Sequence, residues 1–262
     1  SRRRHTRSLC DWSSDVCSSD LAIDLMSYNS DEAESTELWY RLLNCGVKLS
    51  ACVGTDALLD RSTDPLGGDR VYVQTNGPLT MDNWLDGLRN GRTLVTNGPI
   101  PRLKVNGSGP GATIRLGAGG SVRVSASVES LVPFDTVELI QNGQVVSRHA
   151  VIPPGGTAVH RAQVALDLPV ERSGWVALRA RGPQHRTVFD GPAFAHTSPV
   201  WLQVGEAPVT SSDDAQFFVE WIDKLIQVLS ARNRFEKTED RLAVERLFRQ
   251  AQDRYREQLK SR

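Results

Sequence analysis

The segment that most constrains the fold is residues 100–205, where short alternating runs follow one another between Gly/Pro turns. Residues 122–128 alternate apolar side chains with Ser and Arg, as a half-buried strand does. Asn142-Gly143 predicts a hairpin, because these residues accept the positive φ angles of a type I′ turn. Further strands are expected at residues 137–141, 144–147, 159–168, 175–180 and 200–204. About seven short strands without a helix between them predict an immunoglobulin-like β-sandwich over residues 100–206.

The preceding residues 22–99 alternate between strand and helix patterns. Ser30–Asp31 can cap a first helix that stops at Gly46, and Thr80 can cap a second that stops at Gly91. Strands are expected at residues 22–27, 47–53, 70–74 and 93–96. The order strand, helix, strand favours parallel pairing, as in an α/β layer or barrel.

Residues 207–262 carry two apolar stripes at helical spacing and predict a helical hairpin packed on another domain. No strict heptad persists, which argues against a free coiled coil. The fold class expected is therefore α+β and multidomain: part of an α/β barrel, a β-sandwich and a C-terminal helical hairpin.

Residues 1–21 show neither a helical nor a strand period, and they lack the apolar stretch of a secretory signal. The string Asp11–Leu21 resembles a translated sequencing adapter. We therefore expect residues 1–21 to be an artefactual or disordered tail that takes no part in the fold.

Composition excludes several classes of partner. The 31 Lys and Arg balance the 31 Asp and Glu, which argues against nucleic acid or an anionic membrane surface. No run approaches the roughly 18 apolar residues of a membrane-spanning helix. The four cysteines are too few for a disulfide scaffold, and their spacing is not that of a zinc finger.

Two carboxylates are candidate metal ligands. Asp56 follows an apolar strand and a Gly-Thr pair, at the carboxyl end of a strand, where active sites of α/β folds gather. Carboxylates there bind hard divalent cations or orient metal-bound water. Asp24 lies at another strand and is a second candidate. The alternatives are structural: Asp56 as a turn cap and Asp24 as a strand-edge residue.

Arg70 and Asn97 are candidate substrate contacts. Arg70 opens a strand after Gly67-Gly68 and could face an anionic or carbonyl group, or form a surface salt bridge instead. Asn97 ends a strand in Asn97-Gly98-Pro99, where a structural turn is the alternative. His196 opens the last expected strand and is interpreted as a structural histidine, since no second histidine stands at metal-ligand spacing.

Several motifs in order resemble the CehA/McbA family of metallohydrolases, which are related to PHP-domain phosphoesterases. The resemblance spans residues 22–260. Its motifs are Trp39-Tyr40-Arg41-Leu42-Leu43-Asn44-Cys45-Gly46, Gly54-Thr55-Asp56-Ala57, Gly67-Gly68-Asp69-Arg70-Val71-Tyr72-Val73, Gly91-Arg92-Thr93, Thr96-Asn97-Gly98-Pro99 and His196-Thr197-Ser198-Pro199-Val200.

The resemblance implies a PHP-like α/β barrel with a divalent-metal cluster, and hydrolysis of an ester, carbamate or phosphoester by metal-activated water, so that a small-molecule substrate is the expected partner. Asp56 matches the late metal-binding aspartate of that pattern, whereas Leu58 stands where PHP enzymes usually have a histidine. The HxH and further ligands would precede residue 22, so we expect this polypeptide alone to be inactive. The rival interpretation is a non-catalytic binding protein, in which the sandwich carries the function.

Overall fold

Strand β11 (Gly174–Gln184) lies at the centre of the fold. Residues 174–178 are buried without interruption, because this part of the strand is covered on both faces. By contrast β7 (Gly120–Ser130) alternates exposed and buried side chains, since one of its faces meets solvent. The computed structural model describes residues 21–26, 32–55, 66–151, 159–188, 191–232 and 234–260.

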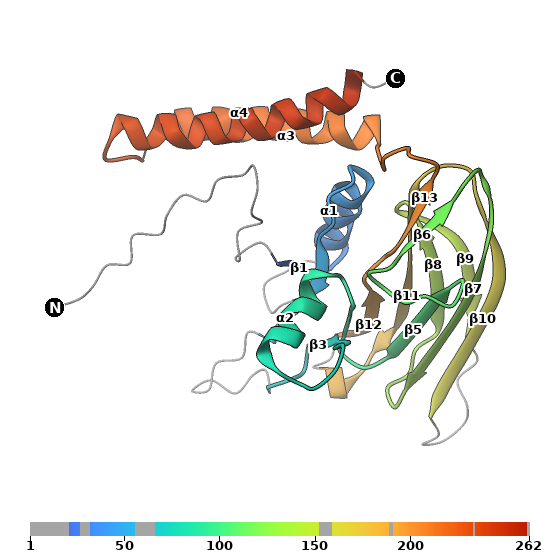
Figure 1. Ribbon diagram of the computed structural model, residues 1–262. Coiled ribbons are helices and arrows are strands. Elements are labelled where there is room, and N and C mark those ends of the chain that lie inside the picture. The colour runs from blue at the N-terminus through green and yellow to red at the C-terminus, as the bar shows by residue number, and fades with distance from the viewer. Residues whose placement is uncertain are drawn as a thin grey trace.

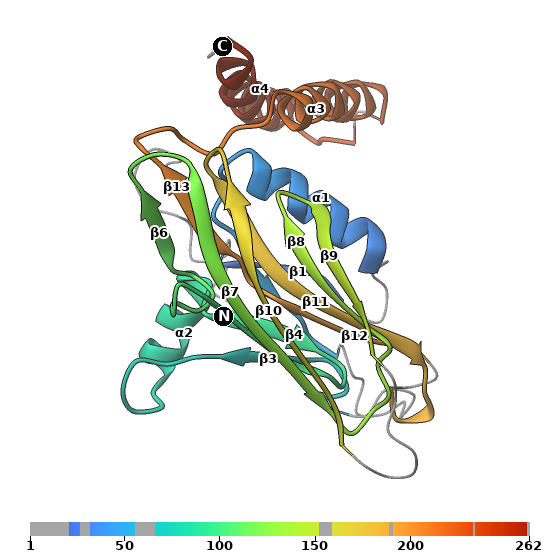
Figure 2. The same ribbon diagram turned by 90° about the vertical axis from the view of Figure 1, so that its right-hand side faces the viewer.

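Two sheets share a hydrophobic core. Within the described residues the smaller sheet has the order β10-β7-β5 and the larger has the order β3-β4-β12-β11-β13-β6, with β8 paired to β11 and β9 to β8. The bounds of these strands are β3 (Arg70–Val73), β4 (Thr93–Thr96), β5 (Ile100–Val105), β6 (Thr113–Leu116), β8 (Thr136–Gln141), β9 (Gln144–Ala150), β10 (His160–Val170), β12 (Pro192–Thr197) and β13 (Val200–Val204). Figures 1 and 2 show the two layers face to face.

The core between the sheets is built from the inward side chains of both. Val124 and Leu103 come from the smaller sheet, and Leu139 and Leu178 from the larger. All four are at most 3% exposed. Burial of this apolar surface is the main stabilising contribution to a two-layer β structure.

Helix α1 (Glu32–Asn44) covers the other face of the larger sheet. Trp39, Tyr40 and Leu43 pack with Trp175 of β11 in a second buried cluster. The parallel pair of β1 (Ala22–Asp24) and β2 (Ser50–Cys52) contributes Ile23 and other residues to the same cluster. The described chain therefore has a third layer of helix and short strands on the outside of the sandwich (Figure 2).

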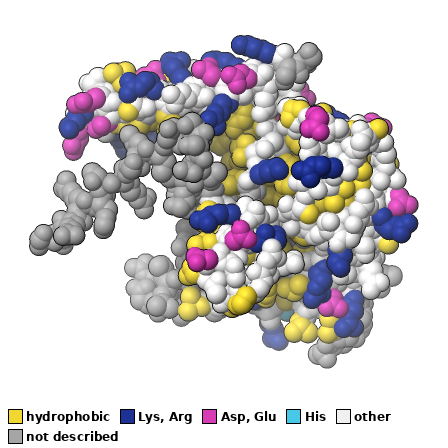
Figure 3. Space-filling model, in the orientation of Figure 1, with side chains coloured by type: hydrophobic (Ala, Val, Ile, Leu, Met, Phe, Trp, Pro, Cys, Tyr) yellow, Lys and Arg dark blue, Asp and Glu magenta, His cyan; other side chains and the backbone are white. Residues whose placement is uncertain are grey.

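Two long helices, α3 (Ser212–Arg232) and α4 (Thr238–Lys260), pack on each other at one end of the molecule (Figure 1). Cys45 at the end of α1 packs with Ala215 and Phe218 of α3 in a third cluster. Arg and Lys side chains are interspersed with Asp and Glu along this hairpin (Figure 3), as its balanced charge leads one to expect.

Local sequence signals are confirmed where the structure describes them. Asn142 and Gly143 have φ angles of 51° and 83°, the positive values that the predicted turn requires. Thr80 caps α2 (Met81–Arg89) by accepting a hydrogen bond from the Asn83 amide. Gly46, with φ of 77°, ends α1. The expected cap at Ser30–Asp31 lies outside the described residues.

The expected parallel pairing is right for one strand pair and wrong for the other. β1 and β2 are parallel around α1. β3 and β4 are antiparallel, and β4 also pairs with β12, so both strands extend the larger sheet of the sandwich. Helix α2 connects β3 to β4 at this edge of the sheet, and an antiparallel pair needs no crossover of the kind that a parallel pair requires.

Candidate functional site

The carboxyl ends of β1 and β2 meet at one edge, because the two strands are parallel. Asp24, the last residue of β1, is in register with Cys52 of β2 and is exposed. Its Oδ1 accepts a hydrogen bond of 3.1 Å from the Met26 amide. Asp24 therefore lies where the sequence places it, at a strand end, with part of its carboxylate engaged by its own backbone.

Thr55 ties this edge to the start of β3. Its hydroxyl donates to the Asp69 carbonyl and accepts from the Gly67 amide, both at 3.1 Å. The segment that leads into Arg70 is thus held beside the end of β2. Asp56, the strongest metal candidate, lies outside the described residues.

Arg70 is partly buried at this position. Its Nη1 donates to the Gly67 carbonyl at 2.9 Å. Its Nε is buried and has no hydrogen-bond partner among the described residues. An arginine nitrogen left without an acceptor is suited to an anionic or carbonyl oxygen of a ligand. The salt bridge considered as an alternative for Arg70 is not formed within the described part of the chain.

Asn97 lies at the same end of the larger sheet, since Arg70 pairs with Thr96. Its Oδ1 accepts from the Phe194 amide at 2.8 Å and its Nδ2 donates to the Pro192 carbonyl at 2.9 Å. Both groups of the carboxamide are thus engaged by the backbone of β12. This geometry favours the structural alternative for Asn97, and its substrate contact stays a prediction.

His196 is fully buried beside the aromatic cluster of α1. Its Nδ1 donates to the Thr197 carbonyl at 2.7 Å, so its Nε2 accepts from the Tyr40 hydroxyl at 2.5 Å. Burial lowers the pKa of His196 to about 3; the hydrogen bond to the Thr197 carbonyl opposes this shift, and the charges of Arg179 and Arg181 add to it. Both ring nitrogens are occupied, which agrees with the structural interpretation of this histidine.

A divalent cation needs several oxygen or nitrogen donors. No group of three or more His, Cys, Asp or Glu side chains that could hold a metal occurs among the described residues. Burial raises the pKa of the Cys52 thiol opposite Asp24, which disfavours a thiolate ligand there. The described side chains alone therefore do not make a metal centre.

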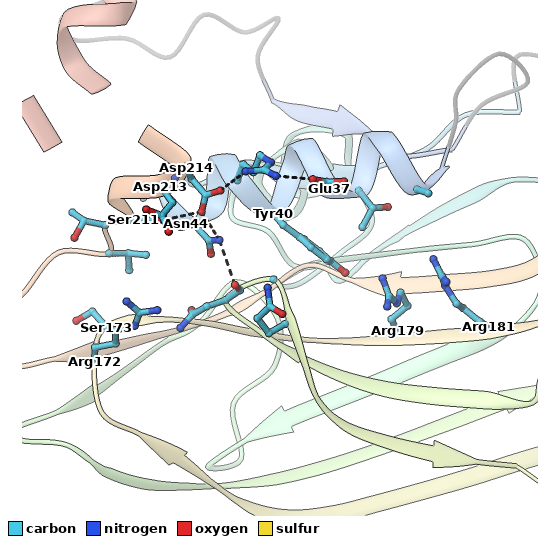
Figure 4. A pocket seen from close by; sticks show the side chains of 18 residues that line it. Glu37, Tyr40, Asn44, Arg172, Ser173, Arg179, Arg181, Ser211, Asp213 and Asp214 are labelled. Atoms are coloured by element: carbon cyan, nitrogen blue, oxygen red, sulfur yellow. Dashed lines mark hydrogen bonds and ion pairs between the residues drawn. The ribbon is translucent and has the colours of Figure 1, made fainter. Parts of the chain in front are cut away.

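A second candidate region is a groove of about 640 Å³ between α1, β11 and the start of α3 (Figure 4). Four arginines line it, Arg41, Arg172, Arg179 and Arg181. Arg179 and Arg181 project toward α1 on the same side as Tyr40, whereas Arg172 lies at the opposite end with Ser211 and Asp213 (Figure 4).

The sequence analysis did not predict this groove. The available signal is Arg179-Ala180-Arg181 inside an otherwise apolar strand, because side chains two apart in a strand share a face. Charged residues on a buried face need either partners or a polar cavity. The pattern could have indicated such a cavity, but not the helix that forms its other wall.

Comparison with protein-family models, curated proteins and solved structures finds no match to this chain. Within the described residues, none of the helices has the length and apolar character needed to cross a membrane.

Proposed function

We propose that this chain is the C-terminal portion of a metal-dependent hydrolase similar to the CehA/McbA family, acting on an ester, carbamate or phosphoester. In this proposal the β1–α1–β2 unit belongs to a PHP-like barrel, whereas β3 and β4 extend the larger sheet of the immunoglobulin-like sandwich, and the helical hairpin follows. Asp56 and Asp24 are metal ligands, and Arg70 contacts the substrate. A bound divalent cation would supply an activated water and polarise the scissile bond.

The observation that carries the proposal is the parallel β1–α1–β2 unit with Asp24 at its carboxyl edge. Parallel strands are rarely stable as an isolated pair and usually belong to larger sheets or barrels. The same edge receives the chain just before Asp56 and, through Thr55, the segment before Arg70. This edge therefore links Asp24 with the segments that lead to Asp56 and to Arg70.

The role of Arg70 follows from its unpaired Nε. A carbonyl or phosphoryl oxygen placed there would receive a charge-assisted hydrogen bond. Because negative charge develops on that oxygen during hydrolysis, the guanidinium would bind it more strongly in the transition state than in the ground state.

The test compares this chain with the longer polypeptide that includes the upstream reading frame. We expect the longer protein to bind divalent metal stoichiometrically and to hydrolyse 4-nitrophenyl acetate, 4-nitrophenyl phosphate or 1-naphthyl methylcarbamate. Asp56→Asn should lower both metal content and turnover, the latter at least about a hundredfold. Arg70→Gln should lower kcat/KM about tenfold with the metal retained.

Glu206→Gln, an exposed turn residue, is the matched control and should change neither quantity. An upstream frame without an HxH motif would contradict the hydrolase proposal. Stoichiometric metal and metal-dependent turnover by the present chain alone would contradict the expectation that it is inactive.

A further inference from the structure

We propose that Thr36, Arg179 and Arg181 form a binding site for a small oxyanion, the phosphate or carboxylate group of an organic ligand. The site is the end of the groove between α1 and β11 at which both arginines point toward the helix (Figure 4). It lies at the same end of the larger sheet as Asn97, since Arg181 pairs with Phe194 and the Phe194 amide donates to Asn97. None of its three residues belongs to the proposed hydrolase site, and its test does not measure hydrolysis.

Arg179 is held in place before any ligand binds. Its Nε and Nη2 donate to Oε2 of the buried Glu138 at 2.7 and 2.6 Å. The other oxygen of Glu138, Oε1, pairs with Nη2 of Arg148 at 2.8 Å. One carboxylate therefore serves two guanidinium groups, and a positive charge is left over. An ordered cation with surplus charge loses little conformational freedom on binding an anion.

Arg181 supplies the second positive charge. It follows Arg179 by two residues on β11, so both side chains leave the same face of the strand. Arg181 is exposed and forms no hydrogen bond or ion pair with any described residue. Two neighbouring guanidinium groups with unused donors form a fork that matches the oxygens of phosphate or carboxylate.

The side chain of Thr36 is a second indication that this end of the groove binds a ligand. It lines the groove from the helix side and is 3% exposed, yet its hydroxyl has no hydrogen-bond partner among the residues that the structure describes. A buried hydroxyl without a partner is costly, and native structures usually satisfy such groups with protein, water or ligand. An oxyanion between the helix and β11 would accept from this hydroxyl and from the arginines opposite it.

The acidic groups of the groove either pair with Arg41 or lie at the other end of the groove. Glu37 and Asp214 both form ion pairs with Arg41, at 2.7 and 2.9 Å. Asp213 lies with Asp214 at the far end, away from Arg181 (Figure 4). The end that holds Thr36 therefore has Arg179 and Arg181 beside the shared carboxylate of Glu138, while Glu37 above them is paired with Arg41, and this favours an anion there.

Isothermal titration calorimetry of the full chain with inorganic phosphate and with benzoate, at constant ionic strength in chloride, tests the site. We expect saturable binding of at least one probe, and the tighter one identifies the oxyanion class. Arg181→Gln should weaken binding about tenfold, since it removes a charge-assisted contact. Thr36→Val should weaken it about threefold while the melting temperature is unchanged or higher, because the orphan hydroxyl is removed.

Arg172→Gln is the matched control, because Arg172 is an exposed arginine of the same groove at its other end. It should bind the probe within about twofold of the unaltered chain. Absence of saturable binding to either probe would overturn the proposal. So would equal affinities for Arg181→Gln and the unaltered chain, or an equal loss in Arg172→Gln, which would indicate general cationic attraction.

Discussion

Tyr40 and His196, 156 residues apart in the chain, share a buried hydrogen bond of 2.5 Å between the phenolic hydroxyl and Nε2. The bond joins α1 to β12 across the cluster that contains Trp39 and Trp175. Burial raises the pKa of Tyr40 above its usual range, against the opposing charges of Arg179 and Arg181, so the phenol stays protonated and donates. This contact fixes the helix on the outer face of the larger sheet.

Tyr40→Phe tests that contact. The substitution keeps the aromatic ring but leaves Nε2 of His196 without a donor in a fully buried place. We expect a loss of about 1–3 kcal/mol in the free energy of unfolding, measured by urea titration. Tyr72→Phe, which alters an exposed tyrosine, should change it by less than about 0.5 kcal/mol. Equal effects of the two substitutions would contradict the structural role of the bond.

Stability should fall as the pH is lowered below 6.5, because the pKa of His196 is about 3 in the folded chain against 6.5 in the unfolded chain. The unfolded state then binds the additional proton, so protonation favours unfolding. Between pH 6.5 and 5 the slope should approach about 1.4 kcal/mol per pH unit.

Urea titrations at intervals over that range measure this slope. Glu138 also has a lowered pKa, since Arg179 and Arg148 outweigh the effect of its burial. The stability that Glu138 contributes is present at pH values above 4.5, the ordinary pKa of a glutamate, and is lost as the pH falls below it. The slope between pH 6.5 and 5 therefore reports mainly on His196. A folded His196→Gln variant should show a flatter profile, whereas an unchanged profile would rule out the histidine as the cause.

Asn44 joins three parts of the molecule through one carboxamide. Its Oδ1 accepts from Nε1 of Trp175 at 2.8 Å, and its Nδ2 donates to Oδ2 of Asp214 at 2.9 Å. Asn44→Ala should cost about 2–3 kcal/mol in urea unfolding, because the buried indole loses its acceptor. Gln227→Ala, on the exposed face of α3, should cost less than about 0.5 kcal/mol.

Glu138 and Glu129 each pair with two arginines but differ in burial, which makes them a matched pair. Glu138→Gln removes the partner of Arg179, whose side chain is 12% exposed, and should cost about 3 kcal/mol. Glu129, with a side chain 46% exposed, faces solvent with Arg102 and Arg161. Glu129→Gln should leave the midpoint of urea unfolding unchanged. Equal shifts would show that burial does not determine the contribution of these ion pairs.

The sequence predicts those parts of the fold that depend on neighbours along the chain. Asn142-Gly143 encodes its turn through allowed φ angles, and Thr80 encodes a helix start through its own hydroxyl. Strand β4 and strand β13 were expected at the bounds that the structure shows. Strand β12 was not expected, because its run of small buried residues has little period, and His196 lies next to the end of this strand and not at the start of one.

The pairing of β3 and β4 could not be read from local order. A strand–helix–strand pattern is compatible with either direction, and the antiparallel arrangement follows from the edge that β12 offers. Among the candidate site residues, some positions could likewise be predicted from local sequence and others could not. Asp24 lies at a strand end as its sequence context predicts, whereas the engagement of Asn97 with Phe194 depends on a strand almost a hundred residues away.

The amino-acid sequence by itself determined the α+β class, the alternating strands and the helical hairpin, since these follow from periodicity and capping. Only the tertiary structure decided which charged and polar groups meet. Thr36 and Arg181 come from a helix and a strand far apart in the chain, and each is unremarked in its own segment. They line one groove because α1 packs its aromatic face on β11, and the cost of unpaired polar groups there makes that place chemically distinctive.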